Sequence, residues 1–195
     1  MSTYKLTIEK LKDIDACDSG IDFVKELNTD CFETIFDEGL KAHREGNLSW
    51  LLPRLMTHEQ KISYAIFAAE QVISIFEGEI KDDKRPREAI EAAKEYLKNP
   101  TDENRDKCKS ASLAATAAAY AYTYAASRVA ASASRAAAVA SRAASYASYA
   151  ATASDSAASA ASDASAYDAD MRVKILSYGY RLLTTDQTTQ PTLGE

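Results

Sequence analysis

The residue types that most often carry out catalysis are sparse in this sequence. Histidine occurs only at His43 and His58. His58-Glu59 begins like a zinc-protease helix, but Ile62 occupies the position of the second histidine. There is no GxSxG motif, no glycine-rich phosphate loop and no paired Cys/His arrangement. The cysteines lack a CxxC spacing and are expected to be buried, reduced thiols: Cys17, Cys31 and Cys108. We therefore expect no enzyme, no metal site and no cofactor.

The segment around Arg85 and Arg87 carries the densest polar chemistry in the chain. Pro86 between them is typical of the first turn of a helix, where the helix dipole disfavours cations. An anionic group should therefore compensate the two guanidinium groups. One hypothesis is an internal ion-pair network with the nearby carboxylates Glu70, Asp82, Asp83 and Glu91. The alternative is that the arginines bind a carboxylate or phosphate of a partner, for which the guanidinium fork is suited.

A second group of candidate binding residues combines tyrosine with arginine in the alanine-rich part of the chain. On helices made mostly of alanine, a tyrosine stands proud of a narrow backbone and leaves gaps beside it. These tyrosines either fill the spaces between helices, or stack with arginine to form pockets for a nucleotide-like small molecule. The candidates are Tyr120, Tyr124, Arg128, Arg135, Arg142, Tyr146 and Tyr149.

The elements that would position these residues are predicted to be helices throughout, in an all-α multi-helix array. Residues 1–100 have the mixed pattern of a globular helical half. Its clearest helix, 58–77, has an apolar stripe at four- and three-residue steps, a capping box from Thr57 to Gln60, and Gly78 after its end. Further helices are expected at 19–27, 30–43, 48–56 (with Pro53 kinking or splitting it) and 86–97.

Residues 101–183 are predicted to form an Ala/Ser-rich, close-packed antiparallel helical half, in one folding unit with residues 1–100. Between 102 and 178 there is no Gly and no Pro, and Ser-Arg pairs recur every seven residues. An antiparallel turn near 148–152 would place Arg142 near Asp155 and Arg135 near Asp163. A last helix at 169–183 should dock on the first half, although Gly179 is a sign that it ends early. Residues 184–195 form a polar tail.

Charge and hydropathy limit the partners. A net charge of −6 and an isoelectric point near 5.1 lack the electrostatic footprint of a protein that binds duplex nucleic acid, and favour a basic partner. The N-terminus has no apolar core of signal-peptide length, and no stretch of 18 apolar residues follows. We therefore expect a cytoplasmic protein with no membrane partner.

Several motifs of the chain together resemble the immunity proteins of bacterial polymorphic-toxin systems, in the immunity protein five-like family. The likeness covers most of residues 9–183. It rests on Ala16-Cys17 followed by Gly20 and Phe23, on Ala68-Ala69-Glu70-Gln71 with Glu77, on the block from Asp83 to Arg87 with Ala89-Ile90-Glu91-Ala92-Ala93, and on the Ala-rich remainder. The resemblance implies a non-enzymatic protein that protects its host by binding.

Two functions follow as hypotheses. The first is a non-catalytic binding protein that neutralises a protein toxin or a defence component through a rigid, acidic, tyrosine-bearing helical face. The second is a phage- or host-encoded sponge that sequesters a nucleotide-like small-molecule signal between the Ala-rich helices. Pairing between copies of the chain through these helices is a further expectation.

Overall fold

The computed structural model describes residues 4–123, 128–145 and 169–185. Within these ranges the chain forms nine α-helices and no strand, which confirms the all-α prediction. The helices are α1 (Ile8–Asp13), α2 (Asp18–Leu27), α3 (Phe32–Lys41), α4 (Glu45–Leu55), α5 (His58–Glu79), α6 (Arg85–Lys98), α7 (Asp102–Thr123), α8 (Arg128–Ser145) and α10 (Ala169–Thr184).

The predicted helices of the first half are present, with small differences at their ends. The capping box of α5 forms as predicted, with Thr57 accepting from the Gln60 amide and the Gln60 side chain accepting from Thr57 N. Gly78 does not end α5, which runs on to Glu79. Pro53 lies inside α4 and does not split it, since the helix continues to Leu55. The short helix α1, capped by Thr7, was not predicted.

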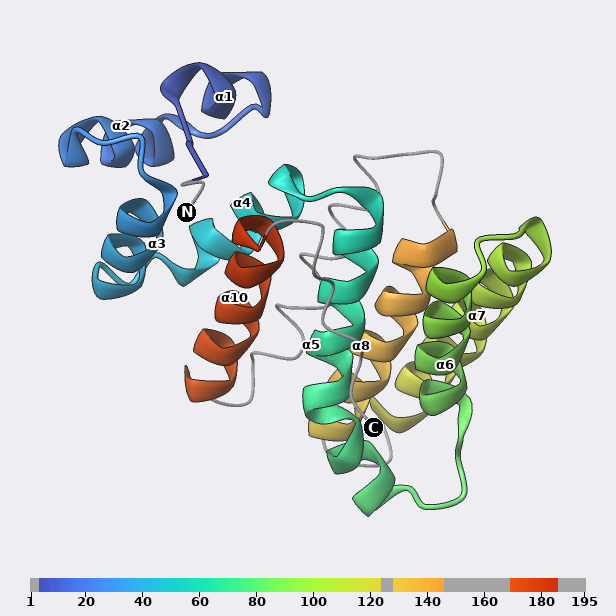
Figure 1. The fold of residues 1–195 in the computed structure, drawn as a ribbon. Coiled ribbons are helices and arrows are strands. Elements are labelled where there is room, and N and C mark those ends of the chain that lie inside the picture. The colour runs from blue at the N-terminus through green and yellow to red at the C-terminus, as the bar shows by residue number, and fades with distance from the viewer. Residues whose placement is uncertain (1–3, 124–127, 146–168, 186–195) are drawn as a thin grey trace.

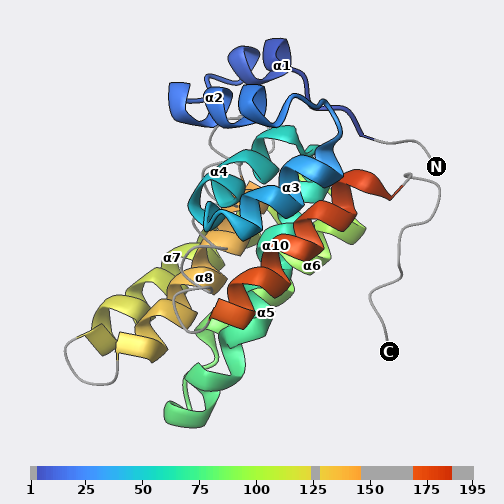
Figure 2. The ribbon, with the colours of Figure 1, turned by 90° about the vertical axis from the view of Figure 1, so that its left-hand side faces the viewer.

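The helices form a bundle with α8 at its centre. Helix α8 packs against α5, α6 and α7, and α10 lies against α4 and α5 on the other side of α5 (Figure 1). Helices α1 and α2 project from one end of the bundle, as both views show (Figure 2). The side chains of α8 that face its neighbours are nearly all alanine, and Ala136, Ala137 and Ala140 are fully buried. A methyl group at each contact lets three helices approach one backbone closely.

Small polar side chains form hydrogen bonds between the close-packed helices. Ser112 on α7 donates to the carbonyl oxygen of Ala138 on α8 at 2.8 Å, and Ser141 on α8 donates to the carbonyl oxygen of Cys108 at 2.7 Å. The Cys108 thiol in turn donates to the carbonyl oxygen of Ala92 on α6 at 3.2 Å. These bonds satisfy buried hydroxyls that would otherwise cost free energy. They also define α7 and α8 as an antiparallel pair.

The reversal between α7 and α8 lies where the sequence showed no turn signal. Helix α7 ends at Thr123 and the antiparallel helix α8 begins at Arg128. The predicted turn at 148–152, the partners Asp155 and Asp163, and the tail from 186 onwards lie outside the described residues. One of the recurring Ser-Arg pairs is Ser141-Arg142 on α8. Its serine is buried against α7, and its arginine is half-buried.

The last helix packs against helices of the first half of the chain. The ring of Tyr178 stacks on Phe67 of α5 with centroids 4.0 Å apart, and Tyr180 packs against Phe36 of α3 at 4.8 Å. Gly179 between them does not end α10. A Cβ atom at this position would lie 2.8 Å from Cε2 of Tyr64, whose side chain is fully buried. Gly179 is therefore the point where α10 comes close enough to touch the α5 side chains.

We expect larger side chains on the α8 contact face to destabilise the fold. Ala140→Leu should lower the free energy of unfolding by at least about 2 kcal/mol, because the close-packed centre has no room for three further carbons. The matched control is Ala117→Leu on the exposed face of α7, with an expected change of about 0.5 kcal/mol or less. Urea unfolding followed by circular dichroism measures both. Equal effects of the two substitutions would contradict close packing at α8.

Gly179→Ala should likewise destabilise the fold, by about 2 kcal/mol, because the added methyl group meets the buried Tyr64 ring and Leu52. Gly78→Ala is the control, since nothing lies within 4 Å of a Cβ atom there. That change should leave stability within about 0.5 kcal/mol of the parent or raise it, because alanine favours helix. Thermal melts of both variants decide the matter, and a melting temperature unchanged by Gly179→Ala would contradict the close approach.

Candidate functional site

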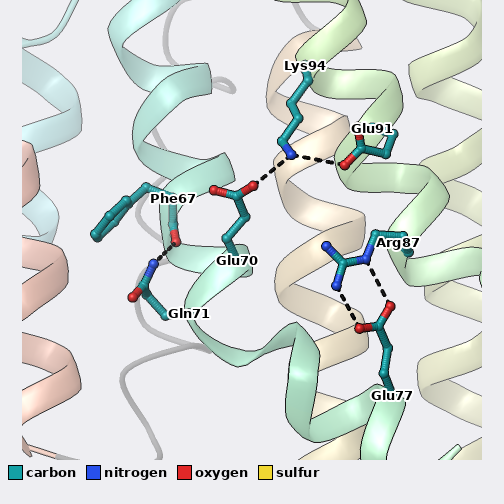
Figure 3. A network of polar contacts seen from close by, with 7 residues as sticks. All are labelled: Phe67, Glu70, Gln71, Glu77, Arg87, Glu91 and Lys94. Carbon is teal, nitrogen blue, oxygen red and sulfur yellow. Dashed lines mark hydrogen bonds and ion pairs between the residues drawn. The ribbon is translucent and has the colours of Figure 1, made fainter. Parts of the chain in front are cut away.

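The junction of α5 and α6 holds ion pairs that join the two helices. We call it the α5–α6 seam and define it by Glu70, Glu77, Arg87, Glu91 and Lys94, whose side chains meet between the two helices (Figure 3). Residues 80–84 connect the helices, so the end of α5 must lie beside the start of α6. This short connection brings carboxylates of one helix to cations of the other.

Arg87 and Glu77 form a two-pronged ion pair across the seam. Nε of Arg87 donates to Oε1 of Glu77 at 2.9 Å, and Nη2 donates to Oε2 at 2.6 Å. The Arg87 side chain is 37% exposed and that of Glu77 is 28% exposed, so solvent screens the pair only in part. The hydrogen bonds from Arg87 hold the pKa of Glu77 below its ordinary value, and Glu77 raises the pKa of Arg87.

Lys94 joins the two helices a little further along the seam. Its Nζ lies 2.8 Å from Glu70 on α5 and 2.9 Å from Glu91 on its own helix. Burial lowers the pKa of Lys94, but the hydrogen bonds to the two carboxylates outweigh burial, and the pKa lies above its ordinary value. Glu70 and Glu91, expected as partners of the arginines, therefore pair with Lys94 instead.

Arg85 is held by a different carboxylate. Asp83 accepts a hydrogen bond from Nε of Arg85 at 2.9 Å and another from the backbone N–H of Arg85 at 3.0 Å. One carboxylate therefore binds both the guanidinium group and a backbone amide of the first helical turn, which has no partner within the helix. Asp83 was among the expected partners, whereas Glu77 was not. The signal for Glu77 was available, since Glu77 lies seven residues after Glu70 on the same side of α5. Both arginines thus have an internal anionic partner.

The tyrosine and arginine candidates of the Ala-rich half do not all come together. The bond between Ser141 and Cys108 places Arg142 level with the first part of α7, whereas Tyr120 lies twelve residues further along that helix. At 1.5 Å per residue the two are separated by about 18 Å along the axis. Arg135 is exposed between these levels. The remaining candidates, Tyr124, Tyr146 and Tyr149, and the side chain of Arg128, lie outside the described residues.

Tyr120 is instead part of an exposed face of α7. It is 71% exposed, and Leu113, two turns earlier on the same side of the helix, is 68% exposed. Ala117 lies between them and is also exposed. We call these three residues the α7 outer face. Large apolar side chains with this exposure contribute nothing to the core, so the α7 outer face is available for contact with another molecule.

The titratable groups with catalytic potential are scattered. Burial lowers the pKa of His58, which lies edge-on to Tyr96, and burial raises the pKa of the Cys108 thiol to about 11. All three cysteines are free, as predicted, but only Cys108 is buried: Cys17 is exposed and Cys31 is partly buried, so the expectation of burial is wrong for these two. No group of three His, Cys, Asp or Glu side chains in the described ranges could hold a metal ion. No helix in these ranges is long and apolar enough to cross a membrane.

The described residues form an all-α bundle with a close-packed alanine helix at its centre and an ion-paired seam beside it. A family model described as "Imm-5 like putative immunity protein" matches residues 52–176, from the end of α4 into α10. The matched segment is well over half of the 195 residues, and the chain belongs to the Imm-5 like immunity protein family. No curated protein and no solved structure matches the chain.

The pairing of Arg87 with Glu77 can be tested by a double-mutant cycle. Because the pair is two-pronged and half-buried, Arg87→Ala and Glu77→Ala should show a coupling free energy of about 1 kcal/mol in chemical unfolding. The control cycle uses Lys107 and Glu103, an ion pair of similar length on exposed side chains, with an expected coupling of a few tenths of a kcal/mol, on the order of other surface pairs. A coupling at Arg87 no larger than the control would leave the arginine available to a partner.

Proposed function

We propose that this protein neutralises a protein toxin by binding it in the cytoplasm, without catalysing a reaction. The observation that carries the proposal is membership of the immunity protein family over residues 52–176. That segment contains the entire close-packed bundle of α5 to α8. A bundle held by methyl-to-backbone contacts and buried hydrogen bonds is a rigid scaffold, which binds a partner with a small loss of conformational entropy.

The α7 outer face is the surface of this scaffold that best suits a toxin. Leu113 and Tyr120 combine aliphatic and aromatic side chains on one helix, and tyrosine is enriched among the residues that dominate binding energy at interfaces. Asp106 and Lys109 lie on the same helix and are exposed, which supplies a polar border. An apolar centre with a polar rim is the usual composition of a protein–protein interface.

The test is protection of bacteria from a protein toxin, sought among the genes that neighbour this one in its source genome. Co-expression of the chain with the toxin should restore growth, and the two purified proteins should elute together in size-exclusion chromatography. Loss of growth despite soluble expression of the chain would contradict the proposed function. Protection without a complex would instead favour sequestration of a small molecule.

The surface can be tested in the same assay. Replacing both Leu113 and Tyr120 by Asp should weaken binding by at least tenfold, because two exposed apolar contacts are lost and two charges are added. Val173→Asp on α10 is the matched control, since Val173 is also an exposed apolar side chain. It should leave protection unchanged. If the double variant protects as well as the parent while the parent forms a complex, the toxin binds another face.

A further inference from the structure

The projecting N-terminal helices enclose a cavity that the function of the bundle does not use. It has a volume of about 390 Å³ and is lined by residues between Leu11 and Leu51, on α1, α2, α3, α4 and the segments that join them. The lining ends before residue 52, where the match to the immunity protein family begins. The volume falls within the range of small-molecule sites, roughly 300–1,000 Å³. This cavity is therefore a feature of the chain beyond the family match.

The body of the cavity is apolar. Phe23, Trp50 and Leu51 supply large side chains, and Leu11, Val24 and Ile35 supply the rest of the apolar surface. Trp50 and Phe23 are only partly buried, so their rings are within reach of a molecule in the cavity. A surface of this kind favours an aromatic or branched aliphatic group over a polar one.

Two charged side chains line the cavity, the cation Arg44 and the anion Asp15. Arg44 is half-buried, lies over the Phe23 ring at 4.5 Å and donates one hydrogen bond to the carbonyl oxygen of Ser19 at 3.3 Å. A guanidinium group has five N–H donors, so others remain for a ligand. Asp15 is exposed in the turn before α2 and forms no ion pair within the described part of the chain. Among the residues lining the cavity these are the two with opposite charge.

We propose that the cavity binds a free α-amino acid with a large apolar side chain. The carboxylate pairs with Arg44, the ammonium group pairs with Asp15, and the side chain packs against Phe23 and Trp50. A simple carboxylic acid leaves Asp15 without a cation, and a simple amine leaves Arg44 without an anion. A zwitterion pairs with both charges, and each pairing adds a charge-assisted hydrogen bond that the simpler ligands lack. The terminal residue of a peptide carries only one of these charges, which selects the free amino acid.

Trp50 provides the measurement, because it is the only tryptophan in the chain and it lines the cavity. The full-length protein is titrated with L-phenylalanine, 3-phenylpropionate, 2-phenylethylamine and L-phenylalanine amide, with tryptophan fluorescence as the signal. L-phenylalanine should bind at least tenfold more tightly than each of the other three. Equal binding of 3-phenylpropionate, equal binding of either amine, or no fluorescence change with L-phenylalanine would overturn the proposal.

Two substitutions separate the roles of the charges. Arg44→Gln should remove the advantage of L-phenylalanine over 2-phenylethylamine, and Asp15→Asn should remove its advantage over 3-phenylpropionate. Asp15 has a left-handed backbone with φ of 56°, which asparagine also tolerates, so this change preserves the turn. Asp13→Asn, an exposed carboxylate of α1 outside the cavity lining, is the control and should change neither ratio. Unchanged ratios in both site variants would overturn the proposed pairing.

A third substitution tests the location. A Cβ atom at Gly20 would lie 3.6 Å from the Cys17 sulfur and 3.9 Å from the Asn47 amide, which are ordinary contacts with two other cavity residues. Gly20→Leu should therefore fill the cavity while retaining the helix, and should abolish the Trp50 response to L-phenylalanine. Circular dichroism establishes that the variant is folded. A folded Gly20→Leu protein that still binds L-phenylalanine would place the ligand elsewhere. This result is independent of toxin neutralisation, which the growth assay measures separately.

Discussion

The close approach of three helices to the backbone of α8 is the constraint on which the rest of the structure depends. Ala136, Ala137 and Ala140 present only methyl groups, so each contact buries little apolar area and many are needed. The short distance between helix axes also brings hydroxyl and thiol groups within hydrogen-bonding distance of carbonyl oxygens on neighbouring helices, as at Ser141 and Cys108. The alanine-rich composition is thus a consequence of interhelical distance as well as of helix propensity.

The same constraint separates two kinds of contact, with alanine packing at the centre of the bundle and ion pairs and large side chains nearer its surface. Alanine contacts give little specificity to the pairing of helices, because every alanine presents the same methyl group. Arg87 with Glu77 and Lys94 with Glu70 join α5 to α6 at defined positions along the two helices (Figure 3). The larger side chains that the centre cannot hold, such as Leu113 and Tyr120, lie outside.

How much the sequence could predict depends on the size and type of the side chains. The stripe of Ile62, Ile66 and Phe76 and the capping box at Thr57 were sufficient to define α5, because both are strong periodic signals. The break between α7 and α8 could not be located, since alanine and serine favour helix on both sides and neither Gly nor Pro marks it. Partners of the arginines were predicted correctly at Asp83, which is adjacent in sequence. Glu77 was missed although it lies seven residues after Glu70 on the same side of α5, because which of these carboxylates meets Arg87 depends on how α6 folds back on α5.

The contact of α10 with α3 and α5 has a consequence for biosynthesis. Tyr180 covers Phe32 and Phe36, and the Gln60 side chain donates to the carbonyl oxygen of Leu182. Chains emerge from the ribosome at roughly 5–20 residues per second. The phenylalanines of α3 are therefore made many seconds before the helix that covers them. During that interval they are open to chaperones or to other nascent chains, and α3 completes its packing only once α10 has been made.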